Sequence, residues 1–206
     1  MNKVLESNST YGGYVCAPYL HNFKSIDLKD SWSHSRNIEK LYFVTATFSN
    51  ESKPYFTSHA NHYLLGKFKD SKKISKEVEQ HIQEKPSFVF SIQDDLFERE
   101  IDNETNFISV YYLEYGESEE DYGEIANVVS KRDKVGKAGI GKMNLYSSET
   151  PKFTFPYKDH IVVLEVSSDK SHQSVNKYCE RTRREVSRKG ITMTNLVSLS
   201  VLEKLK

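Results

Sequence analysis

A carboxylate within an apolar strand is the residue with the clearest chemical potential in this sequence. Glu165 lies in the segment HIVVLEVS, residues 160–167, whose neighbours are almost all apolar. Burial in such a segment disfavours the charged carboxylate and raises its pKa towards neutrality, where a general base works best. We therefore expect Glu165 to be the acid or base of any reaction. The sequence does not establish that the protein is an enzyme, predicts no metal site and leaves a cofactor unknown.

Basic residues at helical spacing suggest a second kind of chemistry. Such a stripe can follow a phosphate backbone, although a charge run is usually the solvated side of a helix. Close by, Asp159 and Glu165 resemble the metal-binding acids of PD-(D/E)xK nucleases, but Ser167 stands where that family has its lysine. The alternative function is therefore a nucleic-acid-binding or degenerate nuclease-like protein using the basic helix 170–188. Its candidate residues are Lys170, Lys177, Arg181, Arg184 and Arg188.

Three other motifs fit structural roles better than functional ones. Residues 136–142 match the phosphate-binding pattern G-x-x-x-x-G-K, but the predicted helix precedes the motif instead of following it. We interpret this segment as a flexible turn. His59 and His62 have the spacing of a helical metal pair, but no third ligand is indicated. Cys179 lies in the apolar stripe of its predicted helix, which favours a buried thiol over a nucleophile.

The C-terminal half alternates between strands and helices. β-Branched and aromatic runs predict strands, and apolar residues at helical spacing predict helices. The order is strand 107–115, a helix beginning at Ser118, strands 141–147 and 160–167, helix 169–188 and strand 191–202. This order predicts a ferredoxin-like βαββαβ half with an antiparallel sheet, in which one sheet face carries both helices.

The N-terminal half is less regular. Strands are predicted at 41–48, 62–68 and 87–92, and a helix at 72–84, whereas residues 1–40 read as an irregular lead-in. We find no internal repeat at the periods of solenoids or propellers. No clean second copy of the βαββαβ pattern can be drawn in this half. The fold class is therefore α+β, with a less regular α+β N-terminal half, residues 1–104, packed on the ferredoxin-like half, residues 105–206. The two halves are either separate units or one continuous domain.

The element order of the C-terminal half resembles the dimeric α+β barrel superfamily. This resemblance implies that the open sheet face encloses a ligand pocket, either in a homodimer or against the protein's own first half. The main prediction is thus a small-molecule-binding α+β barrel-like protein. The other interpretation is that this face packs under the first half, with Glu165 paired to Lys142. Strand phase places on the open face Glu165 and the predicted ligand-binding residues Tyr111, Lys142, Asn144, Tyr146, Thr194 and Ser198.

Composition restricts the class of protein. The chain has 206 residues, of which 37% are hydrophobic, and 13 Tyr and 11 Phe supply core material that a disordered chain would lack. Lys+Arg and Asp+Glu are both 29, and this neutral balance makes nucleic acid a less favoured partner than a small molecule. Two cysteines are too few for a disulfide framework. With no apolar run of membrane length and no signal peptide, we expect a cytoplasmic protein without membrane contact, either monomeric or a homo-oligomer.

Overall fold

The computed structural model describes most of the chain. The described residues are 12–19, 23–50, 52, 60–70, 87–101, 104–114, 119–146, 153–154, 160–168 and 172–206. For residues 23–27, 87, 119, 144–146 and 153–154 only the backbone is described. The predicted helix 72–84 therefore lies outside the described residues.

The described chain consists mainly of strands. The strands are β1 (Gly13–Tyr19), β2 (Ile38–Phe48), β3 (His62–Phe68), β4 (Ser87–Glu98), β5 (Phe107–Glu114), β6 (Val135–Tyr146), β7 (Phe153–Thr154), β8 (His160–Val166) and β9 (Thr192–Lys204). The helices are α1 (Phe23–His34), α3 (Glu119–Ser130) and α4 (His172–Ser187). None of the described helices has both the length and the apolar character needed to span a membrane.

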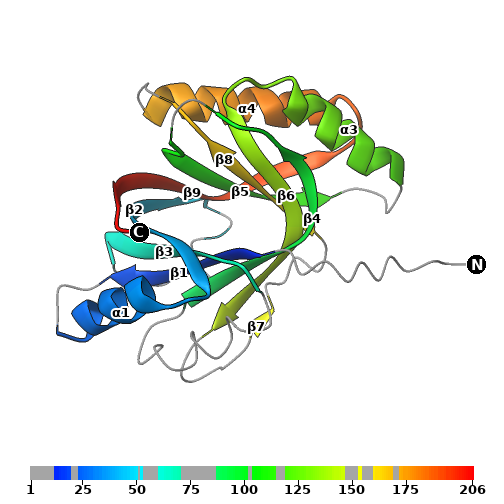
Figure 1. Ribbon diagram of the computed structural model, residues 1–206. Coiled ribbons are helices and arrows are strands. Elements are labelled where there is room, and N and C mark those ends of the chain that lie inside the picture. The colour runs from blue at the N-terminus through cyan, green and yellow to red at the C-terminus, as the bar shows by residue number, and fades with distance from the viewer. Residues whose placement is uncertain are drawn as a thin grey trace, which may run out of the picture.

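Eight of the strands form a closed antiparallel barrel. Their order is β4-β1-β3-β2-β9-β5-β8-β6, and β6 pairs back onto β4 to close the ring, while β7 adds to β6. Two seams join the halves of the chain, β2 with β9 and β4 with β6. Helices α3 and α4 lie on one side of the barrel and α1 on the opposite side (Figure 1). The open sheet face of the C-terminal half is thus closed by strands from the protein's own first half.

The two halves have the same strand order. When the four barrel strands of each half are numbered in chain order, with β7 left out, both β4-β1-β3-β2 and β9-β5-β8-β6 read fourth, first, third, second. From the sequence alone no clean second copy of the C-terminal pattern could be drawn in the first half, so this shared strand order emerges only from the structure. Residues 13–19 and 23–34 are also not an irregular lead-in, since they form β1 and α1. The sequence obscured this because β1 is buried almost throughout and therefore lacks the alternation that marks a half-exposed strand.

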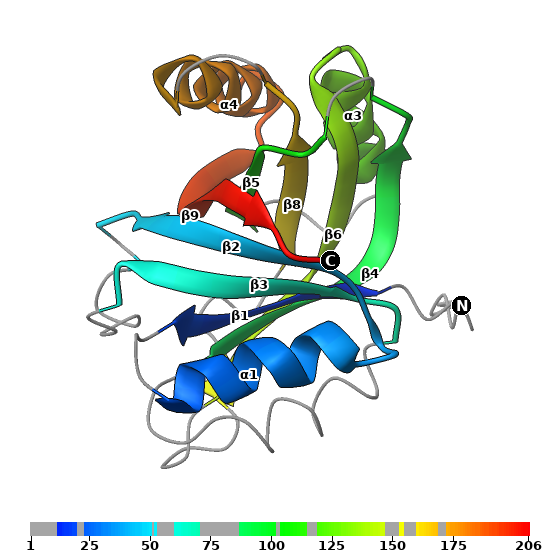
Figure 2. The ribbon, with the colours of Figure 1, turned by 60° about the vertical axis from the view of Figure 1, so that its left-hand side comes forward.

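Three hydrophobic clusters stabilise the barrel and its helices. Side chains that point inward from both halves fill the barrel interior, with aromatic residues such as Tyr63, Phe88 and Phe90 at its centre. A second cluster lies beneath α3 and α4, and a third beneath α1, where Trp32 is buried against the outer face of the sheet. Figure 2 shows the same arrangement from another side, with α1 and the pair α3/α4 on opposite flanks. Each strand therefore has two buried faces over part of its length.

The glycines between 136 and 141 belong to a strand, so the interpretation of this segment as a turn was wrong. Strand β6 begins at Val135 and pairs with both β4 and β8. A Cβ atom on Gly141 would lie 1.9 Å from the carbonyl oxygen of Ser91 on β4. Glycine is required because the backbones of β4 and β6 approach this closely where the barrel closes.

The close approach at Gly141 gives a test of the seam. Gly141→Ala should lower the free energy of unfolding by about 1–3 kcal/mol, because the added methyl group meets backbone and not a flexible side chain. Urea denaturation followed by circular dichroism measures the change. The matched control is Gly123→Ala at an exposed position of helix α3, where nothing lies within 4 Å of the new methyl group. This variant should be more stable than the wild type by about 0.5–1 kcal/mol, because alanine favours the helix more than glycine does. Equal stability of the two variants would contradict the close approach.

Candidate functional site

Glu165 points into one end of the barrel. Along β8, Val162 and Leu164 pack beneath the helices, whereas Ile161 and Val163 face the barrel interior. Successive side chains of a strand alternate between its faces, so Glu165 lies on the interior side with Ile161 and Val163. This is the orientation that the strand phase assigned in the sequence analysis predicts, away from α4.

The carboxylate of Glu165 forms an ion pair with a lysine of the first half. Lys67 Nζ on β3 lies 3.1 Å from Glu165 Oε1, and Thr105 Oγ1 donates a hydrogen bond of 3.2 Å to Glu165 Oε2. The side chains of Lys67 and Glu165 are only 17% and 8% exposed. The pairing of Glu165 with Lys142 was therefore wrong, because the partner comes from β3 of the first half and not from the adjacent β6.

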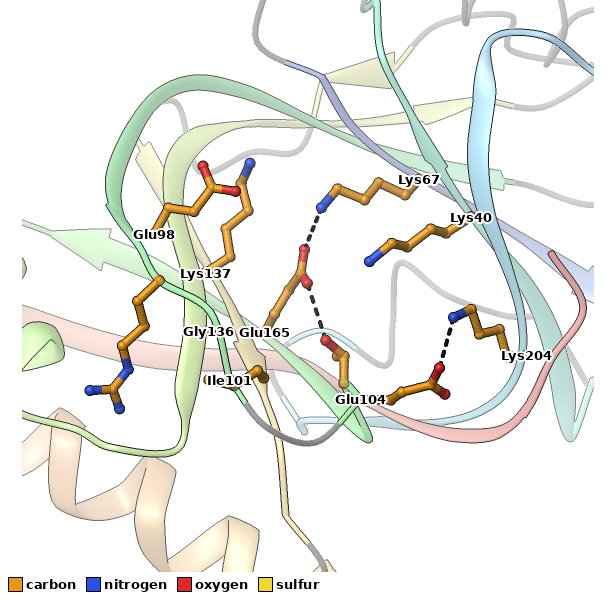
Figure 3. A pocket seen from close by; sticks show the side chains of 11 residues that line it. Lys40, Lys67, Glu98, Ile101, Glu104, Gly136, Lys137, Glu165 and Lys204 are labelled. Carbon is orange, nitrogen blue, oxygen red and sulfur yellow. Dashed lines mark hydrogen bonds and ion pairs between the residues drawn. The ribbon is translucent and has the colours of Figure 1, made fainter.

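This ion pair borders a cavity of about 340 Å³ at the end of the barrel. Here β2 and β6 begin while β3, β4, β8 and β9 end, so the cavity receives residues from both halves. Figure 3 shows charged side chains from these strands directed towards its centre. The lining residues are Lys40, Lys67, Glu98, Arg99, Ile101, Glu104, Thr105, Gly136, Lys137, Glu165 and Lys204.

Cross-strand register explains the electrostatics of the cavity. Lys40 is directly paired with Lys67 in the β2–β3 ladder, and Lys137 is directly paired with Glu165 in the β6–β8 ladder. Like charges at directly paired positions repel each other, since their side chains share one face. Glu165 compensates for the Lys40–Lys67 repulsion by its ion pair with Lys67. Lys40 itself forms no ion pair with any described residue.

Both members of the buried pair titrate near neutral pH. Burial raises the pKa of Glu165 to about 7. Burial, together with the positive charges of Lys137 and Lys40, lowers the pKa of Lys67 to about 8. Burial thus moves the titration of both groups towards neutral pH, whereas their mutual attraction at 3.1 Å favours the charged forms.

A smaller hollow of about 180 Å³ adjoins the cavity behind Lys67 and Lys137. Lys137 Nζ lies 3.4 Å from Asp95 Oδ1, which fixes the position of this lysine. Lys67 Nζ lies 5.9 Å from the ring centroid of Tyr14, and the buried Tyr14 hydroxyl has no hydrogen-bond partner among the described residues. Tyr14, which lines the hollow, thus carries a buried hydroxyl without a partner among the described residues.

Two of the predicted ligand-binding residues lie on the opposite face of the sheet from Glu165. Tyr111 is buried beneath α4, where burial raises its pKa well above the usual range. Ser198 is paired across the sheet with Ser109, whose hydroxyl accepts a hydrogen bond of 3.5 Å from the thiol of Cys179. The strand phase was wrong because the β5 sequence FISVYYLE is apolar on both faces, and a bulge interrupts the β5–β9 register next to Tyr111.

The other predicted ligand-binding residues are not brought to Glu165 either. Lys142 is exposed on β6, and Thr194 lies at the start of β9, at the end of the barrel away from the cavity. The side chains of Asn144 and Tyr146 lie outside the described part of the structure. The central part of the predicted face is packed dry against the first half, so the structure combines packing in the middle with a cavity at one end.

Sequence analysis missed the lysines of the cavity. Lys67 is the sixth residue of β3, HYLLGKF, as Glu165 is the sixth residue of β8, HIVVLEV. A charged residue at an inward phase of an apolar strand was therefore present in both halves. This pattern predicts a pairing between Lys67 and Glu165 only when β3 and β8 are known to occupy equivalent positions in the two halves.

The remaining motifs take structural roles in the described residues. The ring of His62 stacks on Phe43 with centroids 5.0 Å apart, and His59 lies outside the described residues. Among the described residues no group of three or more His, Cys, Asp or Glu could hold a metal ion. Cys179 is buried, and burial raises the pKa of its thiol, which disfavours a nucleophilic role.

The basic stripe lies on the outer face of α4. Lys177, Arg181, Arg184 and Arg188 are all exposed, whereas Lys170 lies outside the described residues. Arg181 forms a 3.6 Å ion pair with Glu185. The sheet separates this stripe from Glu165, so the two do not form one nuclease-like site.

Comparison with known proteins finds distant similarity to solved structures. The sequence matches no protein-family model and no curated protein. A solved structure described as a crystal structure study of an anthrone oxidase-like protein is similar to this chain with a TM-score of 0.39 and 6% identity, over 96% of this chain and 93% of that chain. A match at this level assigns no role to any residue of this chain.

The pKa of Glu165 makes stability depend on pH. An ordinary glutamate in the unfolded chain has a pKa of about 4.3. Because the folded value is raised to about 7, its contribution to stability is fully present below the unfolded pKa and is lost as the pH rises through 7. The double variant Lys67→Met/Glu165→Gln, which leaves no unpaired buried charge, should therefore gain stability relative to the wild type between pH 5 and 7, by up to about 1.4 kcal/mol per pH unit.

Urea denaturation at several pH values measures this difference. The control is the exposed pair Lys69–Glu39 at the same end of the barrel, whose Nζ and Oε1 atoms lie 3.7 Å apart. The variant Lys69→Met/Glu39→Gln should change stability by less than about 1 kcal/mol at every pH. A stability difference of the Lys67/Glu165 double variant that does not change with pH would show that Glu165 is not buried as described.

Proposed function

We propose that the protein binds a small anionic molecule in the cavity at the barrel end, where Glu165 and Lys67 act as a proton-exchanging acid–base pair. The observation that carries this proposal is the 3.1 Å pair between two largely buried side chains at the wall of a cavity of about 340 Å³. A volume of this size lies in the range of small-molecule sites.

The charges of the lining favour an anion. Five cationic side chains and three carboxylates line the cavity, and Lys40 forms no ion pair with a described residue. Its ammonium group points towards the middle of the cavity in Figure 3. A carboxylate or phosphate next to Lys40 would also offset the repulsion between Lys40 and Lys67.

The titration of the pair favours proton transfer to and from the ligand. A group whose pKa lies near the working pH is populated in both protonation states and can both accept and donate a proton. Glu165, with a pKa of about 7, meets this condition, and Lys67 holds it in position. We therefore propose Glu165 as the acid or base of a reaction at this site.

The symmetry of the barrel supports the resemblance to the dimeric α+β barrel superfamily. We propose that each half of the chain is a ferredoxin-like unit and that the whole is a single-chain counterpart of such a dimer. Lys40 and Lys137 occupy equivalent positions of β2 and β6, as Lys67 and Glu165 do in β3 and β8. At these equivalent positions the first half has a lysine, Lys67, and the second half has a glutamate, Glu165, and this difference creates the ion pair.

Binding of small anions tests the ligand class. Isothermal titration with succinate and with inorganic phosphate, at constant ionic strength, should detect binding to the wild type. Lys40→Met should weaken it by about tenfold, equivalent to about 1.4 kcal/mol, because the unpaired ammonium is lost. The control Lys142→Met removes an exposed lysine on β6 and should leave affinity unchanged. Equal affinities of both variants would reject the cavity as the anion site.

Nucleic-acid binding on α4 is the second candidate function. One observation favours it: Lys177, Arg184 and Arg188 are exposed and form no ion pair with any described residue. Four phosphate contacts, including one from Arg181, would produce a steep dependence on salt. This surface is independent of the cavity, so the two functions are tested separately.

Salt dependence tests the α4 surface. Binding of a fluorescent duplex oligonucleotide should weaken by about 100-fold between 50 and 200 mM salt if four phosphates are neutralised. The charge reversal Arg181→Glu/Arg184→Glu should abolish it, whereas Lys131→Glu, exposed beyond the end of α3, should have little effect. Affinity that is unaffected by the reversal would dismiss the stripe as a nucleic-acid site.

A further inference from the structure

Three lysine side chains from three strands converge on the cavity beside Glu165. Lys40, Lys67 and Lys137 come from β2, β3 and β6 and all line the cavity. Figure 3 shows the ammonium groups of Lys40 and Lys67 directed towards Glu165, whereas that of Lys137 points away from Glu165. Their environments differ. Lys137 is held by Asp95, Lys40 forms no ion pair with a described residue, and Lys67 contacts Glu165.

Lys67 has the surroundings of a nucleophilic amine. An amine attacks a carbonyl carbon only in its neutral form, which burial and neighbouring cations favour. Lys67 is 17% exposed, is directly paired with Lys40 and lies at the cavity wall. Its lowered pKa of about 8 agrees with this geometry. At pH 7.5 the neutral fraction is about 200-fold larger than for an ordinary lysine.

We propose that Lys67 forms an imine with small oxo acids, with Glu165 transferring the protons and Lys40 binding the substrate carboxylate. This inference rests on the proposed function, since it names the substrate class of the same cavity. An oxo acid combines the two groups that the lining can recognise, a carbonyl for the amine and an anionic group for the unpaired ammonium.

The reaction needs no co-reactant beyond the two partners. Proton transfer from Lys67 to Glu165 leaves a neutral amine and a carboxylic acid 3.1 Å apart. The amine nitrogen bonds to the carbonyl carbon, and the carbonyl oxygen receives the proton from Glu165. The nitrogen then returns a proton to the Glu165 carboxylate, which passes it to the hydroxyl group. The hydroxyl leaves as water and an iminium remains, and hydrolysis reverses each step.

Reductive trapping tests this proposal on the full chain. The protein is incubated with pyruvate and sodium cyanoborohydride, digested and mapped by mass spectrometry, which locates the stable secondary amine. We expect Lys67 to be modified at least about tenfold faster than the exposed lysines Lys142 and Lys177. Glu165→Gln, which keeps Lys67, should slow the trapping at Lys67 by about tenfold or more. Lactate, which has the carboxylate but no reactive carbonyl, should compete with pyruvate and protect Lys67.

The outcomes separate this inference from the function on which it rests. Modification that follows exposure, with Lys67 among the slowest sites, would overturn the imine. If lactate binds in a Lys40-dependent manner and Lys67 is not trapped, the anion site stands and the imine chemistry is rejected. If neither lactate nor pyruvate binds and Lys40→Met has no effect, both proposals fail. Because a Lys67 variant removes a buried charge, Lys67→Arg serves as a folded control and should show no adduct at position 67.

Discussion

Closure of the barrel is the constraint on which the site depends. The β2–β9 and β4–β6 seams bring the two four-stranded sheets together, so that the face of β8 opposite α4 is covered by β1 to β4. Closure needs the close approach of β4 and β6 at Gly141. It also places Lys67 against Glu165, two residues 98 positions apart in the sequence.

Charge at the barrel end follows from the near-symmetry of the halves. Glu165 on β8 is the equivalent of Lys67 on β3. If it were also a lysine, four ammonium groups would face one another across the barrel end, because Lys40 is paired with the first position and Lys137 with the second. Glu165 in one half relieves this repulsion for Lys67, whereas Lys40 forms no ion pair with a described residue. Cationic side chains outnumber carboxylates five to three in the cavity lining, which is the charge balance that an anion site needs.

Hydrophobic side chains fill the middle of the barrel, whereas the cavity lies at one end of it. Buried aromatic side chains from the first half and aliphatic side chains from the second half fill the middle and exclude water, which gives the walls a low dielectric constant. The charged groups at the end of this dry core are therefore poorly solvated, and burial is the main cause of the shifted pKa values of Glu165 and Lys67. The hydrophobic core thus both stabilises the fold and tunes the titration of the site.

The sequence by itself determined the features that depend on local pattern: the strands and helices of the C-terminal half and the inward orientation of Glu165. Successive side chains of a strand point to opposite faces, so the direction of Glu165 follows once Val162, Leu164 and Val166 are assigned to the helix side of β8. Only the tertiary structure decided the partner of Glu165, the true face of Tyr111 and the matching strand order of the first half. Local periodicity does not encode which distant strands pair with each other. Strands such as β1 and β5 are buried on both faces, so their sequences do not show which side chains point into the barrel.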